Sequence, residues 1–407
     1  MSTQVAERPA APPPAESAAS DRGPRAAGWA AIVAAFLAFF VALPPIESRS
    51  AVPTVILGVI ALAAAGWAIA GGEKRLGWSA VVAAAVGIAG GIAATKSGVT
   101  NLERVVAWSA LFAAMLRYAT PLLFAALGGM MSERSGVINI GLEGMMLMGA
   151  FWGVWGAETT GSWVAGLLIG MVSGVLLALV HAIFAVSLRA DQIVSGFSMN
   201  LLAAGITGFF YVNIYGTEGT PDNLPRTPDI TLPGIEDIPF VGDVIGSLNV
   251  LVWLGLLTVL LLWVLLFRTP TGLRIRSVGE NPLAAETAGL SPVKIRYRAV
   301  AASGALAAIG GAYLSIGFVG SFTENMTAGR GFIGLAVMIC GRWLPQGALV
   351  FALIFGFFTA LAQRLPVFSE QAATLFQALP YVVTLIAVAG VVGRSIPPAA
   401  DGRPLDR

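Results

Sequence analysis

The sequence is almost without cysteine and histidine, and it is poor in charge. Its 407 residues include one cysteine, Cys340, and one histidine, His181. A single cysteine excludes an intramolecular disulfide and a metal site made of cysteines, and a single histidine cannot form a histidine metal site unaided. Charged residues make up 11% of the chain, whereas a typical soluble domain has about 25%. The composition therefore argues against a soluble protein.

Motifs of nucleotide and ester hydrolysis are missing as well. The sequence has no G-x-x-x-x-G-K-S/T loop, which would cradle phosphates with its backbone amides, and neither H-E-x-x-H nor G-x-S-x-G occurs. We therefore expect a chain that is not an enzyme, holds no cofactor of its own and does not hydrolyse ATP. The net charge of +2 gives no indication of nucleic-acid binding.

Long apolar runs dominate what is present. Hydrophobic residues make up 57% of the chain, and a membrane-spanning helix needs about 20 consecutive apolar residues. We predict an all-α polytopic membrane protein with about 11 or 12 spanning or half-spanning helices. The run 331–342 is too short for a full span and is expected to be half of a broken or re-entrant element. The twelve runs lie near 28–45, 51–70, 77–94, 105–130, 140–157, 161–187, 191–213, 248–267, 299–320, 331–342, 345–363 and 372–393.

Lysine and arginine predict the orientation. With the N-terminus inside, 17 of the 24 basic residues fall in inner loops, 6 fall in outer loops and Arg117 lies within the membrane. Cytoplasmic loops carry the basic excess, so we expect both termini in the cytoplasm of a cell-membrane protein. The outer loop 214–247 is acidic and rich in proline, which predicts an extended cap rather than a helix.

Four regions differ in composition. Residues 1–27 are rich in alanine and proline and are predicted to be a disordered cytoplasmic tail. Residues 28–104 form an N-terminal extension of about three spans, for which the sequence suggests no role. Residues 105–395 are the expected core, and 396–407 form a second cytoplasmic tail.

Two stretches of the core are alike. AALGGMM (125–131) is followed by INIGLEGMMLMGA (138–150), and AAIGGAY (307–313) is followed by GFIGLAVMICGRW (331–343). On the predicted topology the two pairs run in opposite directions, which is typical of transporters that place their pathway between inverted repeats. A shared richness in glycine and alanine is the alternative explanation.

Polar residues at membrane depth are candidates for a translocation path. Glu143 lies shortly inside an apolar run, where a carboxylate costs about 2.5–3.5 kcal/mol unless it faces protein or a cavity. Asn139 and Glu143 either line the path, or cap the helix start and complement its dipole. Arg117 lies in the middle of a span, one turn before Pro121. Its guanidinium either pairs with Glu143, binds a backbone carbonyl freed by the proline, or extends to the membrane surface.

The next runs add further polar candidates. His181 is expected to be a hydrogen-bonded interior histidine rather than a proton relay. Asp191 precedes an apolar run and is expected to cap its helix. Ser195 and Asn200 follow within that helix, either to bind a polar solute or to hold helices together.

The stretch 269–298 is polar and basic and separates two apolar runs. Pro282 is suited to the first turn of a short helix and Gly289 to its end. A small helix in a cytoplasmic loop is typical of a docking element for a soluble partner, with Glu286 available to pair with a basic residue. The alternative is an interfacial loop whose basic residues contact anionic lipid. The candidate docking residues are Asn281, Pro282, Ala284, Ala285, Glu286 and Gly289.

Four motifs in order resemble one known family. SERSGVINIGLEGMMLMGA, RADQIVSGFSMNLLA, TPTGLRIRSVGENPLAAETAGL and MTAGRGFIGLAVMICGRWLPQGAL resemble the permease subunits of ATP-binding-cassette importers for nucleosides, in the ribose, simple-sugar and branched-chain amino-acid permease superfamily. The resemblance covers roughly residues 105–395. Within it, Leu283-Ala284-Ala285 followed by Gly289 is similar to the EAA-x-x-x-G coupling motif, with leucine in place of glutamate.

The resemblance implies an assembly. It implies a second, homologous permease subunit in a heterodimer, cytoplasmic ATPases that bind ATP and magnesium and dock at Asn281–Leu290, and an extracytoplasmic lipoprotein that delivers a nucleoside or a simple sugar. The alternative from the residues alone is a secondary transporter coupled to protons through Glu143, Arg117 or His181.

Overall fold

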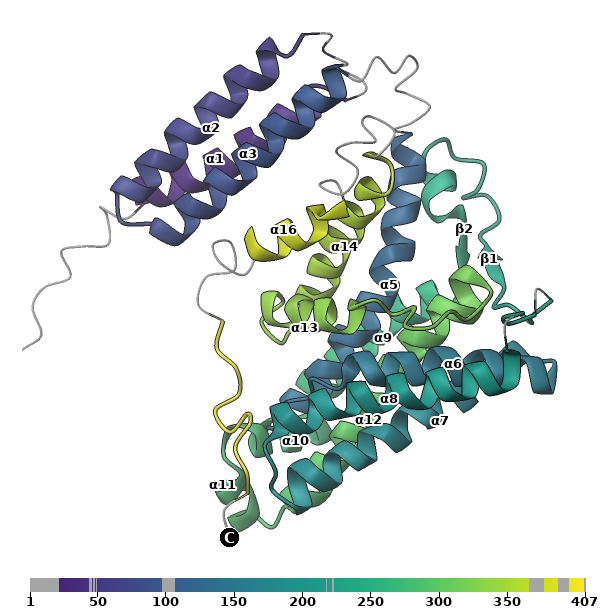
Figure 1. Cartoon of the computed structure of the whole chain (residues 1–407). Helices are drawn as coiled ribbons and strands as arrows, with labels where there is room; N and C mark the ends of the chain where they lie inside the picture. The colour runs from purple at the N-terminus through teal and green to yellow at the C-terminus, as the bar shows by residue number, and fades with distance from the viewer. Residues whose placement is uncertain are drawn as a thin grey trace, which may run out of the picture. The chain divides into compact units, whose positions relative to one another are not determined.

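The computed structural model describes residues 22–43, 46, 48, 50–96, 107–216, 218–221, 223–365, 377–386 and 395–405. The chain divides into two compact units, and each is described by itself. The first unit holds three helices, and the second holds the remaining elements (Figure 1).

The first unit is a bundle of α1 (Arg22–Phe40), α2 (Val52–Ala70) and α3 (Lys74–Lys96). Small residues let its helices approach closely, since a side chain at Gly87 would meet the backbone of Ala35. Residues 22–27 were predicted to be disordered, but they form the first turns of α1. Ala26 and Ala27 favour helix and extend the apolar helix toward the N-terminus. Residues 1–21 lie outside the described residues.

The second unit is built almost entirely of helices, as predicted. Between α8 and α9 the described residues are largely non-helical and contain one antiparallel pair of short strands, with Asp229 opposite Asn249. Its elements are α5 (Trp108–Glu133), α6 (Leu142–Thr160), α7 (Trp163–Ala182), η1 (Ile183–Ser187), α8 (Gln192–Tyr215), β1 (Asp229–Thr231), η2 (Gly242–Gly246), β2 (Ser247–Asn249), α9 (Val250–Arg268), α10 (Pro270–Glu280), α11 (Pro282–Thr287), α12 (Pro292–Ala312), η3 (Tyr313–Val319), α13 (Arg330–Cys340), α14 (Pro345–Ala362) and α16 (Leu379–Ile386).

Each of the twelve predicted apolar runs coincides with a helix. Within the described residues, nine helices are long and apolar enough to cross a membrane. The other three runs correspond to α6, α13 and α16. With only 11 residues, α13 is too short for a full span, as predicted for the run 331–342. The run predicted at 372–393 lies partly outside the described residues, and its described part contains α16.

The stretch 269–298 is more ordered than predicted. Thr269 caps α10 by accepting a hydrogen bond from the amide of Gly272, and Pro270 occupies the first helical turn. The expected loop is therefore three consecutive helices, α10, α11 and the start of α12, because each begins at a proline that presets the helical φ.

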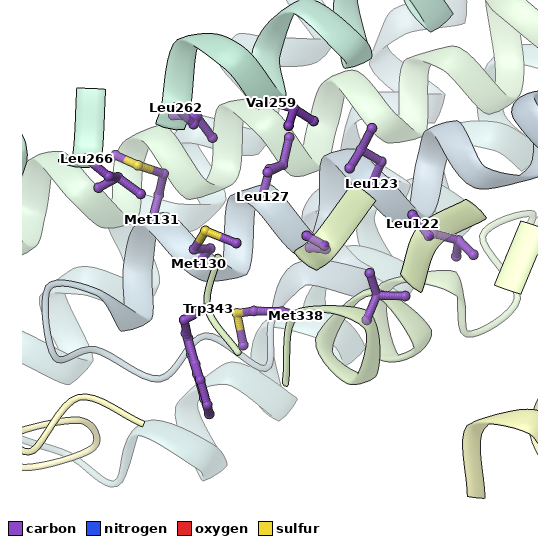
Figure 2. Close-up of a cluster of buried hydrophobic side chains, with 14 of the residues drawn as sticks. Leu122, Leu123, Leu127, Met130, Met131, Val259, Leu262, Leu266, Met338 and Trp343 are labelled. Atoms are coloured by element: carbon purple, nitrogen blue, oxygen red, sulfur yellow. The ribbon is translucent and has the colours of Figure 1, made fainter. Parts of the chain in front are cut away.

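Two packing modes hold the second unit together. Large side chains of α5, α9, α13 and α14 form one core, in which Met130, Leu127 and Met338 lie together (Figure 2). Around α6, α7 and α12 the contacts are instead made by small residues: side chains added at Gly149 and Gly174 would meet α12. Glycine allows such close helix contacts, so α12 packs closely against α6 and α7.

Both members of the sequence echo consist of a long helix, a break and a second helix. The first is α5, the segment 134–141 and α6; the other is α12 with η3, the segment 320–329 and the shorter α13. The two long helices pack against each other, with Gly128 against Ser303. The inverted repeat itself stays a prediction.

Candidate functional site

The break between α5 and α6 is fastened by polar side chains from three helices. Gln192 of α8 accepts a 2.8 Å hydrogen bond from the amide of Ile138. His181 of α7 lies 3.0 Å from the carbonyl oxygen of Ile138 through Nε2, and 3.0 Å from the hydroxyl of Ser195 through Nδ1. Because a carbonyl only accepts, Nε2 carries the proton and Nδ1 accepts from Ser195. His181 is thus the interior, hydrogen-bonded histidine that the sequence predicts.

Asn139 occupies the centre of the break and is fully buried. Its Oδ1 accepts from the amide of Gly141 at 3.0 Å, and its Nδ2 donates to the hydroxyl of Ser303 at 2.9 Å. Asn139 therefore closes a local turn before α6 and ties that turn to α12, although the N-cap position of α6 is Gly141.

Glu143 lies in the first turn of α6 and is 7% exposed. Its two oxygens accept hydrogen bonds from the amides of Gly329 (2.7 Å) and Gly331 (2.6 Å) at the start of α13. These amides have no partner within their own helix, and the carboxylate also complements the positive end of α6. The pair between Glu143 and Arg117 is absent from the described residues, because both carboxylate oxygens are directed to α13.

Asn200 of α8 bridges the same region. Its Oδ1 accepts from the amide of Gly144 at 2.8 Å, and its Nδ2 donates to the carbonyl of Ile140 at 3.0 Å. Four of the five candidate path residues thus gather at the start of α6: Asn139, Glu143, Ser195 and Asn200. Their polar atoms are bound to other parts of the chain, so these residues hold the break in place.

Arg117 is the fifth candidate and lies elsewhere. It is exposed in the first half of α5, whereas the second half of that helix is buried. An exposed guanidinium within a span needs water, headgroups or another subunit beside it. Within the described residues, no three histidine, cysteine, aspartate or glutamate side chains gather as a metal site would require.

The helix α11 carries the candidate docking residues. Asn281 caps it by accepting a 3.0 Å hydrogen bond from the amide of Ala284, Pro282 is its first residue, and Gly289 follows it with φ of 81°. The helix is shorter than the predicted Asn281–Leu290. Ala285 is buried, whereas Leu283 is 56% exposed.

The remaining docking candidates lie on the open side of α11. Ala284 and Glu286 are exposed, as is Gly289 beyond the end of the helix. Together with Leu283 they form a small surface that is accessible to a partner.

Sequence reasoning missed a second polar cluster at the end of the bundle that carries α10 and α11. The indole Nε1 of Trp343 donates to Glu133 at 2.6 Å, and Arg134 donates to the carbonyl of Trp343 through Nε and Nη2. Arg296 is buried and donates to the carbonyl of Ser135 at 3.2 Å. These charged residues lie near helix ends in the sequence, where only their contribution to topology was apparent.

Comparison with known proteins identifies similar chains. The family model described as branched-chain amino acid transport system / permease component matches residues 111–388. The guanosine ABC transporter permease protein NupQ of Bacillus subtilis (strain 168) is 42% identical over 310 residues, which is 73% of this chain and 96% of that protein. The nucleoside ABC transporter permease protein NupC of Lactococcus lactis subsp. cremoris (strain MG1363) is 39% identical, with 72% and 95% covered.

A sugar-related protein is also similar. The putative glucose ABC transporter permease protein TsgC13 of Haloferax volcanii is 38% identical over 258 residues, which is 62% of this chain and 77% of that protein. No solved structure matches the chain.

Proposed function

The chain belongs to the family of branched-chain amino acid transport system permease components, and we propose that it forms the membrane pathway of an ATP-binding-cassette importer for nucleosides. The observation that carries the proposal is the near full-length match to relatives named for guanosine and nucleoside transport. A solute as polar as a nucleoside needs a protein path through lipid.

The exposed surface of α11 supports an external energy source. The chain has no phosphate-binding loop, and its short helix presents Leu283, Ala284 and Glu286 to a partner. In this proposal a cytoplasmic ATPase binds ATP and magnesium and docks on α11, so both termini and α11 face the cytoplasm. A homologous permease subunit and an extracytoplasmic lipoprotein complete the transporter, with the two permeases forming a heterodimer.

The candidate path residues take two different roles. Asn139, Glu143, Ser195 and Asn200 have their polar atoms engaged with backbone and side chains around the helix break, so they fix the shape of the pathway wall. Arg117 is exposed on α5 and is the residue of this set that is accessible to a solute or to the second permease.

Proton-coupled transport receives less support from the same contacts. His181 donates through Nε2 to a backbone carbonyl, which cannot accept a proton onward. Both oxygens of Glu143 accept hydrogen bonds from backbone amides at the start of α13. A relay through these residues would have to break the contacts that hold the helix break.

The substrate class needs a direct test. The complete transporter, with its ATPase and second permease, would be reconstituted in liposomes and supplied with radiolabelled guanosine, other nucleosides, ribose and glucose. ATP-dependent uptake of nucleosides in preference to both sugars supports the proposal. Uptake of glucose alone would place the chain with its sugar-transporting relatives instead.

A further inference from the structure

The C-terminal segment 395–405 is fastened to several elements of the second unit. The hydroxyl of Ser395 donates to the carbonyl of Ile339 in α13 at 2.9 Å. The amide of Ala400 donates to the carbonyl of Gly279 near the end of α10 at 2.9 Å. Figure 1 shows this yellow segment beside α10 and α11. The segment was predicted only as a tail, yet it lies directly against the helix that precedes α11.

Its deepest contact is with Arg296 of α12. This side chain is fully buried, and its Nη1 donates to the carbonyl of Arg403 at 3.0 Å. Within the described residues its Nη2 has no hydrogen-bond partner. Asp401 is the acid whose charge acts on Arg296. Lifting the segment away would leave Nη1 of a buried guanidinium without the carbonyl of Arg403 as its acceptor.

Asp401 continues the connection to α5. Its carboxyl lies next to that of Glu133, the last residue of α5. Burial holds the pKa of the Asp401 carboxyl above its usual value. Glu133 in turn accepts from the indole of Trp343. Trp343 itself has a left-handed backbone, with φ of 52°, at the corner between α13 and α14.

These contacts form a continuous path from α10 to the membrane helices. It runs from Gly279 through Ala400 and Asp401, and from there to α12 and α5. By contrast, Ala285 is the single buried residue of α11 in the described structure, so α11 packs only weakly against the helix bundle. A displacement of one element passes to another through packed and hydrogen-bonded contacts, and the C-terminal segment supplies such contacts close to α11.

We propose that residues 395–405 are a positioning element that makes α10 and α11 move together with α5, α12 and α13, with Asp401 as its central residue. This inference rests on the proposed function, because it takes α11 as the place where an ATPase delivers its force. Loss of the element leaves the ATPase docked but reduces how much of its movement reaches the pathway.

Three substitutions in the complete transporter test this. Asp401→Ala removes the carboxyl next to Glu133, whereas Asp401→Asn keeps a polar side chain of nearly the same size at this place. Arg403→Ala is the matched control, because its side chain is exposed and its backbone carbonyl is retained. Nucleoside transported per ATP hydrolysed is measured in liposomes, together with the amount of ATPase that co-purifies.

The expected result is at least a threefold lower ratio of transport to hydrolysis for Asp401→Ala, with ATPase binding unchanged. Asp401→Asn and Arg403→Ala keep the wild-type ratio. A wild-type ratio in Asp401→Ala, or a loss matched by an equal loss of bound ATPase, overturns the inference. Failure of the wild-type complex to transport nucleosides is a separate result, which contradicts the proposed function.

If Asp401→Ala does not fold, the wild-type complex can still be used to test the inference. The amide of Ala399 donates to the carboxylate of Glu280, the last residue of α10, at 3.3 Å. Hydrogen exchange at the Ala399 and Ala400 amides is compared without nucleotide and with a non-hydrolysable ATP analogue. A positioning element stays attached in both states, so both amides remain protected. Release of these amides when the analogue binds shows that the segment detaches, which overturns the inference.

Discussion

The carboxylate of Glu143 accepts a 2.6 Å hydrogen bond from the backbone amide of Gly331, and this contact joins the first turn of α6 to the first turn of α13. The two residues are 188 positions apart in the chain. Two helix N-termini share one negative charge there, and each stabilises it through its dipole. Charge-assisted hydrogen bonds of this kind are about twice as strong as neutral ones.

Gly331→Ala should displace this contact. A Cβ at residue 331 would lie 2.5 Å from the amide nitrogen of Glu143 and 2.6 Å from its Cα, so backbone has to move. Overpacking of this kind costs about 1–3 kcal/mol, and we expect a lower thermal unfolding temperature in detergent. Gly205→Ala in α8 is the control, because nothing lies within 4 Å of its added Cβ. Equal stability of the two variants would show that the contact tolerates displacement.

Glu143→Ala should leave the amides of Gly329 and Gly331 without acceptors. Each unsatisfied buried donor costs about 1–3 kcal/mol, so this variant should be less stable than Glu143→Gln, which retains one acceptor oxygen. Transport and thermal unfolding are measured for both variants. A Glu143→Ala protein that unfolds at the wild-type temperature would mean that water replaces the carboxylate without loss.

Leu283→Ala should weaken ATPase docking. Full burial of a leucine side chain contributes about 1.5–3 kcal/mol, and Leu283 is 56% exposed in the isolated chain. We expect the dissociation constant of the ATPase to rise about tenfold or more, with membrane insertion unchanged. Leu273→Ala is the control, since Leu273 is 61% exposed on α10. An equal effect of both variants would argue against α11 as the docking site.

The attachment of the C-terminal segment should depend on pH. Burial raises the pKa of Asp401 to about 7, and Glu133 and Arg296 are the charged groups that face it. The attached segment binds the proton more tightly than a free segment, whose aspartate has a pKa of about 3.9. Attachment is therefore strongest at low pH, weakens as pH rises from about 4 to about 7, and is constant above that.

Hydrogen exchange at the Ala399 and Ala400 amides, corrected for its intrinsic pH dependence, measures this effect. Protection should fall between about pH 4 and about pH 7 in the wild type, and the dependence should disappear in Asp401→Asn. Protection that increases with pH would contradict a raised pKa at Asp401.

The sequence predicted what depends on neighbours along the chain. Each of the twelve apolar runs contains a helix in the described residues, Asp191 caps α8 as expected, and Pro282 and Gly289 mark α11. The cap at Thr269 and the proline after it also signalled α10, although the basic composition suggested a loop.

The partners of Glu143 and Asp401 could not be predicted in this way. Glu143 contacts a segment 186 and more positions away, and the pair of Asp401 with Glu133 forms only after the chain has folded back on itself. A carboxylate within an apolar run indicates that a partner exists, yet its spacing carries no information about which of several distant amides or side chains it meets. A pair with Arg117, one of three alternatives for that residue, was suggested by charge, whereas the folded chain directs Glu143 to backbone amides.

The most direct test of the central claim is the energy source of uptake by the reconstituted transporter. Liposomes that contain this chain, its second permease and the ATPase are given a labelled nucleoside, with ATP or a protonophore varied separately. The account predicts uptake that requires ATP, survives the protonophore and is lost when the ATPase is omitted. Uptake that continues without ATP and stops with the protonophore would contradict it.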